Sequence, residues 1–379
     1  MRNYVYTHPA LKAHAGRFVW LMINVENDVN NAFMTHFPIQ GLPTLLVIEP
    51  ESEEVALKWL GSLTVDKLIR LFDDAELAVD PGAAGPADEA LAQGDRAFAR
   101  DDFTAAAAAY GKAVELGGEG WSRRSRALDS WIMSLNLARD YPACVRVARR
   151  HAPSMPRDQS FGGVVANAFD CALSGGDEEG RRFFEPLVRE ALGVEAILAD
   201  DRSSLYGFLC MTLEDGGAVD ESRALAREWL EFLEKQRRAA PDAAAASTFD
   251  SHLAWAAVVA GQPERAIPGL KASEAALPDD YNPPARLALI YAELKRFDEA
   301  LAASDRALAR VYGPRRVRVL RDRADIYRDM GKPEEARRTL EEALEVAESF
   351  PEGQRSERMI ADLKHRLDAL NDPSPESSP

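Results

Sequence analysis

The C-terminal third of the chain repeats itself at a spacing that restricts it to one kind of architecture. Ala266, Ala300 and Ala336 lie in the similar stretches GQPERAIPGL, KRFDEALAAS and GKPEEARRTL, 34 residues (266 to 300) and 36 residues (300 to 336) apart. Self-similarity at this period is typical of helical repeat arrays. Each repeat is therefore expected to be two short antiparallel helices, which bury their apolar faces only by stacking on neighbouring repeats.

Small and large apolar residues recur at fixed positions in these repeats, with small residues where two helix axes approach. Gly261 and Gly331 would end the first helix, and Pro263 and Pro333 would begin the second. The pattern resembles the tetratricopeptide repeat, whose first helices line a peptide-binding inner face. The matching residues are Leu253, Ala254, Ala257, Ala266, Leu270 and Ser273; Leu287, Ala288, Tyr291, Phe297, Ala300, Ser304 and Ala307; and Leu320, Ala324, Tyr327, Ala336, Leu340 and Ala343.

Residues 1–79 have a different pattern, in which short apolar runs alternate with helical stretches. FVWLMINVE (Phe18–Glu26) is predicted to be a buried strand because it is a continuous apolar run with β-branched and aromatic residues. The other predicted elements are a helix over 1–17 broken at Pro9, a helix over 30–36, strands over Thr44–Glu49 and Glu54–Trp59, and a helix over Thr64–Phe72.

This order of elements resembles the C-terminal three quarters of a thioredoxin fold, and GLPTLLVI is the most specific piece of the resemblance. The resemblance implies a cis peptide bond before Pro43, with Leu42 and Thr44 beside a substrate-binding backbone. The alternative is an ordinary trans proline that opens an edge strand. The family's Cys-x-x-Cys motif is not found, because Cys144 is the first cysteine.

Two explanations of the missing motif stay open. The natural start lies upstream of Met1 and includes the first strand and the cysteines, or the module is degenerate and has lost catalysis. In either case the chain as given cannot perform dithiol chemistry. Since the missing strand is central in the family's sheet, we expect residues 1–79 to be less protected from amide exchange than residues 250–349.

The remaining segments follow from breaks in composition and period. Residues 157–248 are interpreted as divergent helical hairpins, the alternative being a structural break between two repeat blocks. The predicted organisation is a module over 1–79, a linker over 80–86, tetratricopeptide-like repeats over 87–156, divergent hairpins over 157–248, repeats over 249–350, a capping helix over 351–370 and a disordered tail over 371–379.

Composition narrows the class of partner and the location. A formal net charge of −16 argues against nucleic acid or an anionic membrane as the main partner. No apolar run approaches a membrane span and no signal-peptide core is found, so a cytoplasmic location is expected. The odd, widely spaced set Cys144, Cys171 and Cys210 predicts small buried residues rather than disulfides or a zinc site.

No catalytic residue, metal site or cofactor is predicted, because the common catalytic and phosphate-binding motifs are absent. The predicted peptide groove could bind an acidic or carboxyl-terminal peptide through arginines. The alternative is that Asp322, Asp325 and Asp329 neutralise those arginines as i,i+4 partners. Repeat register assigns to the groove Ser251, Trp255, Asn282, Leu289, Arg318, Arg321 and Arg328.

The sequence thus predicts a multidomain protein, with a small incomplete thioredoxin-like α/β module followed by an all-α tetratricopeptide-like superhelix. The function expected is a non-enzymatic scaffold that binds a protein or peptide on the repeat array. The alternative is a thiol-disulfide oxidoreductase of thioredoxin type whose cysteines lie upstream, with the repeats as partner adaptor. A catalytically inactive thioredoxin fold used for peptide binding or dimerisation lies between the two, and self-association stays open.

Overall fold

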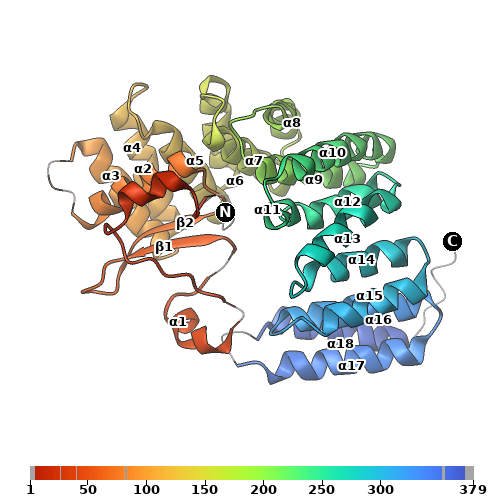
Figure 1. Cartoon of the computed structure of the whole chain (residues 1–379). Helices are drawn as coiled ribbons and strands as arrows, with labels where there is room; N and C mark the ends of the chain where they lie inside the picture. The colour runs from red at the N-terminus through yellow and green to blue at the C-terminus, as the bar shows by residue number, and fades with distance from the viewer. Residues whose placement is uncertain are drawn as a thin grey trace. The chain divides into compact units, whose positions relative to one another are not determined.

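Antiparallel helical pairs account for most of the structure (Figure 1), a computed structural model that describes residues 5–25, 27–39, 41–80, 82, 84–351 and 355–371. The helices of the array are α3 (Pro86–Ala99), α4 (Phe103–Gly117), α5 (Arg124–Leu137), α6 (Tyr141–His151), α7 (Gln159–Ser174), α8 (Glu178–Leu192), α9 (Ala199–Asp215), α10 (Val219–Ala239), α11 (Ala243–Ser247), α12 (Asp250–Val259), α13 (Ala266–Ala276), α14 (Asn282–Glu293), α15 (Phe297–Leu308), α16 (Arg315–Asp329), α17 (Pro333–Ser349) and α18 (Glu357–Asn371). Short 3-10 turns lie at Ala152–Ser154 and Pro263–Arg265.

The same tight turn joins the two helices of each pair. One residue takes a left-handed φ of +56° to +76°, and the next N–H donates to the carbonyl five residues back, as from Lys332 to Tyr327 at 2.9 Å. Such a turn satisfies carbonyls that the helix end leaves unpaired. Because it recurs at both divergent hairpins, these share the local design of the consensus repeats. The left-handed residues are Asp101, Arg139, Gly176, Gly217, Gly261, Lys295 and Gly331.

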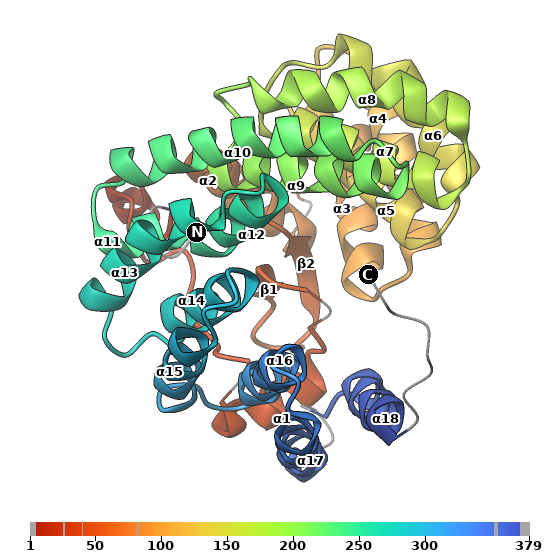
Figure 2. The same ribbon diagram turned by 90° about the vertical axis from the view of Figure 1, so that its right-hand side faces the viewer.

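The apolar positions picked out by the repeat period form the core between pairs. Ala266, Ala300 and Ala336 are at most 1% exposed, so the helix axes approach closely there. In Figure 2, α14, α15, α16 and α17 follow one another in the stack. The predicted capping helix is α18, which buries Ile360 and Leu363 against α16 and α17. The predicted tail from residue 372 lies outside the described residues.

The chain divides into two compact units, with the boundary inside α9. Unit 1 comprises Met1–Val19 and Gln40–Phe208, and unit 2 comprises Trp20–Ile39 and Leu209–Pro379. Part of the predicted N-terminal module therefore groups with the later helices. Within unit 2, the Asn24 side chain donates to the Tyr312 hydroxyl at 2.9 Å.

The N-terminal residues contain one small sheet. Strand β1 (Thr44–Ile48) pairs antiparallel with β2 (Val55–Leu60), in a register from Thr44 opposite Leu60 to Ile48 opposite Val55. The peptide bond between Leu42 and Pro43 is cis. The other elements are 3-10 turns at Pro9–His14 and Asp28–Asn30, helix α1 (Asn31–His36) and helix α2 (Val65–Val79).

The strand predicted over Phe18–Glu26 is wrong. Residues 19–24 belong to no strand, and Val19, Leu21 and Met22 are 90%, 75% and 68% exposed. Glu26 lies outside the described residues. An apolar run becomes a strand only where a neighbouring strand takes its backbone hydrogen bonds, and the described sheet has two strands. The thioredoxin resemblance is thus reduced to the order β1, β2, α2.

The cysteine prediction is also wrong in one respect. Cys144 on α6 and Cys171 on α7 form a disulfide, with Cα atoms 6.3 Å apart. Both residues are fully buried, as predicted, and so is Cys210, whose thiol donates to the Ser222 carbonyl at 3.7 Å. The spacing of 27 residues does not predict a disulfide, because the two cysteines come together only when the second helix of one pair packs on the first helix of the next.

Candidate functional site

The first helices of successive pairs form one face in each unit, here called the first-helix face. In unit 1 this face includes α3, α5 and α7, and in unit 2 it includes α12, α14 and α16. Peptide contacts were predicted on this face from the repeat resemblance. The two faces are described separately below, beginning with unit 1.

A buried lysine of α2 reaches across the unit 1 face. Lys67 Nζ donates to Asp129 Oδ2 on α5 at 2.7 Å and to Ser160 Oγ on α7 at 3.2 Å. The ammonium also lies 4.2 Å from the centre of the Trp59 ring. Lys67 is 7% exposed and Asp129 is 4% exposed, so this ion pair is almost fully removed from water. A buried charge of this kind is tolerated only when paired.

A second buried ion pair lies further along α2. Asp74 bonds to Arg123, directly before α5, at 2.5 Å and to Arg126 on α5 at 3.2 Å. Arg126 in turn bonds to Asp95 on α3 at 2.6 Å, and Tyr110 donates to the same carboxylate at 2.7 Å. Burial raises the pKa of Asp95 although Arg126 opposes the shift. The charges of α2 and α5 are thus matched along the contact.

Asp201, at the start of α9, completes the charged surroundings of Lys67. Burial and the neighbouring Asp200 raise the pKa of Asp201 to about 6. Hydrogen bonds from Gln159 and Ser62 and the charge of Lys67 act in the opposite direction but do not cancel the shift. Asp201 therefore changes charge in the mildly acidic range.

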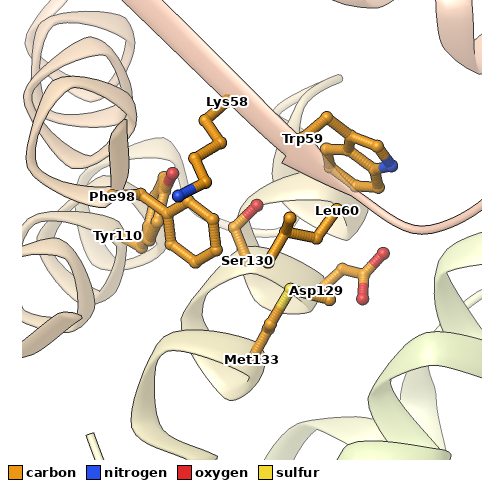
Figure 3. Close-up of a pocket in the computed structure, with 8 residues that line it drawn as sticks. All are labelled: Lys58, Trp59, Leu60, Phe98, Tyr110, Asp129, Ser130 and Met133. Atoms are coloured by element: carbon orange, nitrogen blue, oxygen red, sulfur yellow. The ribbon is translucent and has the colours of Figure 1, made fainter. Parts of the chain in front are cut away.

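A small cavity lies where β2 meets the helices of unit 1 (Figure 3). It has room for about one water molecule. The buried Asp129 Oδ1 has no hydrogen-bond partner in the described part of the chain. The cavity is too small for a ligand and suits a bridging water. Its lining residues are Lys58, Trp59, Leu60, Phe98, Tyr110, Asp129, Ser130 and Met133.

The unit 2 face brings together two arginines that form no ion pair with a carboxylate of the described residues. Arg286 on α14 donates through Nε to Ser251 Oγ on α12 at 3.0 Å. Burial and the positive charges of Arg318 and Arg315 lower the pKa of Arg286, while Asp322 acts in the opposite direction. Arg318 on α16 is exposed and forms no ion pair or hydrogen bond within the residues described. This cluster of Ser251, Arg286 and Arg318 is the basic cluster.

Other predicted groove residues do not join the basic cluster. Arg328 bonds to Asp325 at 2.6 Å and to Asp329 at 3.0 Å, so these carboxylates do neutralise it, although not at the spacing of four residues that was predicted. Arg321 likewise bonds to Asp322 at 3.2 Å. These pairs are one or three residues apart along α16.

The uncharged members of the predicted groove have ordinary surroundings. Trp255 packs edge-on against Trp229, with ring centres 5.0 Å apart. The Asn282 side chain donates to Asp280 at 2.8 Å at the start of α14, and Leu289 is half-buried. Their role in binding stays a prediction.

Arg286 was missed from the sequence although it is the most buried arginine of the basic cluster. The repeat register assigned Asn282 and Leu289 to the groove from this helix. Arg286 lies one turn after Asn282 and, since helix residues three to four apart share a face, the same register could have included it. Helix periodicity, and not a sequence motif, is the signal that could have identified Arg286.

The surroundings of Pro43 carry no redox chemistry among the described residues. Leu42 is 60% exposed, Thr44 Oγ1 donates to the Gly41 carbonyl at 2.6 Å, and the Pro43 carbonyl accepts from Gly61 at 3.0 Å. All three cysteines lie in the helical pairs and are buried. In the described ranges no group of side chains is arranged to hold a metal ion.

Comparison with known proteins gives the class of the repeats. The family model for the tetratricopeptide repeat matches residues 281–349, which the structure folds as α14 to α17. The chain therefore carries tetratricopeptide repeats. No curated protein matches the chain. Across the described residues, no helix is both long and apolar enough to cross a membrane.

Solved structures of low similarity include other repeat proteins. One is a tetratricopeptide repeat protein from Parabacteroides merdae, 11% identical, with a TM-score of 0.47 over 76% of this chain and 99% of that one. Another is the TPR2AB domain of yeast Sti1 in a complex with pHSP90, 17% identical, with a TM-score of 0.28 over 74% of this chain and 98% of that one. Likenesses this weak carry no argument about function.

Proposed function

We propose that this protein is a non-enzymatic interaction scaffold that binds an acidic segment of a polypeptide on the first-helix face of unit 2. The observation that supports the proposal is the basic cluster. Arg286 is half-buried with only a hydroxyl partner, and Arg318 next to it is exposed without a partner in the described residues. Both guanidinium groups can therefore donate hydrogen bonds to a carboxylate.

Carboxylates are the ligands expected for such a pair. A guanidinium group presents a planar set of N–H donors that matches a carboxylate, and the charge strengthens each hydrogen bond. Half-burial beside a like charge makes Arg286 costly to hold unpaired, and an incoming carboxylate would relieve that cost. Because the whole chain carries a net charge of −16, an acidic peptide is repelled elsewhere and directed to this cluster.

A binding assay with short acidic peptides tests the proposal. The probe is a fluorescent peptide of alternating glutamate and alanine with a free carboxyl terminus, and its amidated form shows whether the terminal carboxylate matters. We expect the double substitution Arg286→Ala and Arg318→Ala to weaken binding at least about tenfold. Added salt should weaken binding to the original chain.

The matched control is Arg338→Ala, which removes an exposed arginine from the second helix of the last pair. We expect this control to change the dissociation constant less than about twofold. Unchanged binding in the double variant, or no binding of either peptide to the original chain, would contradict the proposed function.

A further inference from the structure

Helix α2 has three faces with different surroundings. Leu68, Leu71, Phe72 and Ala75 point into a hydrophobic cluster, whereas Asp66, Arg70, Asp73 and Glu76 form an exposed stripe. The third face holds Lys67, Asp74 and Ala78, which are buried against the helical pairs. The third face is therefore polar although it is buried, which is unusual for a helix that belongs to a single core.

The apolar core beneath α2 is built from the N-terminal residues themselves. It contains Val5, Leu11, Leu57, Trp59, Leu63, Leu68, Leu71, Phe72 and Ala75. Contact with the array combines ion pairs, a small alanine cluster of Ala56, Ala78 and Ala92, and the packing of β2, where Leu60 lines a cavity with Phe98 and Met133. A segment with its own core and buried ion pairs at its interface resembles a bound partner more than an inner layer of one core.

The two charges on the third face of α2 have a defined order and spacing. Lys67 and Asp74 are seven residues apart, which is about two helical turns. They meet Asp129 on α5 and the pair Arg123 and Arg126 at its start, in the reverse order along the chain. Helix α2 therefore runs antiparallel to α5, and each charge faces its opposite.

We propose that the first-helix face of unit 1 is a second protein-binding surface, selective for an amphipathic helix with a basic residue two turns before an acidic one, and that α2 occupies this surface in cis. A partner helix with the same charge order would compete with α2. The apparent affinity of the partner helix is then its intrinsic affinity multiplied by the fraction of molecules in which α2 is released, so it is low while α2 stays bound. The second surface is thus closed until α2 leaves it.

The test uses the full chain and a labelled peptide of residues 62–80 with the natural sequence. The double substitution Lys67→Glu and Asp74→Arg sets like charges against Asp129 and against Arg123 and Arg126. We expect the variant to bind the peptide at least about tenfold more tightly than the original chain, because its surface is open. Amides of α5 and α7 should exchange faster in the variant without peptide and slow again when peptide is added.

Two results would overturn the proposal. One is a folded variant with exposed α5 and α7 amides that does not bind the peptide. The other is simultaneous loss of protection throughout unit 1, including the β1–β2 pairing, which would make α2 an inseparable part of the core.

A second measurement decides the matter if the variant cannot be purified as soluble protein. Excess peptide added to the original chain should speed amide exchange in α2 by displacing it, whereas a peptide with Lys67 and Asp74 exchanged in position should not. Equal effects of the two peptides, or none from either at saturation, would also overturn the proposal.

Discussion

The two first-helix faces are built from the same kind of helical pair and the same kind of turn, but they differ in whether their buried charges are paired. In unit 1 the two buried charged groups of α2 each face an opposite charge, Lys67 with Asp129 and Asp74 with Arg123 and Arg126. In unit 2, Arg286 has a hydroxyl partner and Arg318 has none among the described residues. The buried charges of the first face are paired within the chain, whereas the second face is the one we propose to bind an external anion.

This difference separates stability from binding. Paired buried charges hold α2 in place, and removing one partner leaves the other uncompensated. Unpaired half-buried charges contribute nothing favourable to the fold, so they are sites where a ligand can gain free energy. The same repeat architecture can therefore carry a closed face and an open face in one chain.

The largest expected effect comes from Lys67→Met. This substitution leaves Asp129 buried without its cation, so the free energy of unfolding of unit 1 should fall by about 3–5 kcal/mol. Urea unfolding followed by amide exchange in α5 measures the change. The control Arg70→Met lies on the exposed stripe of the same helix and should cost less than about 0.5 kcal/mol. Similar losses of stability in the two variants would contradict the claim that the buried ion pair of Lys67 holds α2 in place.

The next effect concerns the covalent link between two pairs of unit 1. Replacing Cys144 and Cys171 by serine removes a disulfide that closes a loop of 27 residues, and should cost about 3 kcal/mol. A reducing agent should lower the melting temperature of the original chain but not that of the variant. A melting temperature insensitive to reduction in the original chain would show that the disulfide does not stabilise unit 1.

A smaller effect depends on pH through Asp201. Its pKa is raised in the folded state to about 6, above the ordinary value of 3.8, so the folded state binds the proton more tightly. Unit 1 should therefore gain about 1 kcal/mol from this group when pH falls from about 7 to about 5. Urea midpoints at several pH values should show this gain in the original chain and a smaller gain in Asp201→Asn. An identical pH dependence in the two proteins would refute the assignment.

The smallest effect is expected in unit 2, at the turn of α14 and α15. Lys295 has φ of +56°, a conformation that glycine adopts without strain and that Gly261 and Gly331 adopt in the neighbouring pairs. Lys295→Gly should stabilise the chain by about 0.5 kcal/mol, measured as a higher urea midpoint. Ala292→Gly, inside α14, should instead destabilise it by about 1 kcal/mol. A loss of stability in both variants would mean that Lys295 makes contacts that outweigh its strain.

Much of the helical array could be predicted because its signal is local. Apolar period, turn residues and the small residues at helix crossings all lie within one repeat, and they fixed the pairs around Ala266, Ala300 and Ala336. Gly261 and Gly331 identified two turns, but Asp101, Arg139 and Lys295 adopt the same left-handed conformation without a glycine. The residue type of those three positions gives no signal of a turn.

The charged contacts of unit 1 could not be predicted because their partners are far apart in sequence. Lys67 and Asp129 are 62 residues apart, and nothing in either local pattern indicates the other. The run Phe18–Glu26 failed for the opposite reason, since its local pattern is strong but its pairing partner is not in the described sheet. In unit 2, Arg318 was predicted from the register, and Arg286 was missed although it lies one helical turn after Asn282 on the same face.

The most direct test of the contrast between the two faces is an amide-exchange footprint of the acidic peptide on the full chain. We predict slower exchange in α12, α14 and α16 when the peptide binds, with no change in α5 and α7, which α2 already covers. Protection of α5 and α7 instead, or protection of α12, α14 and α16 that persists in the Arg286→Ala and Arg318→Ala variant, would contradict the assignment of the open face to unit 2.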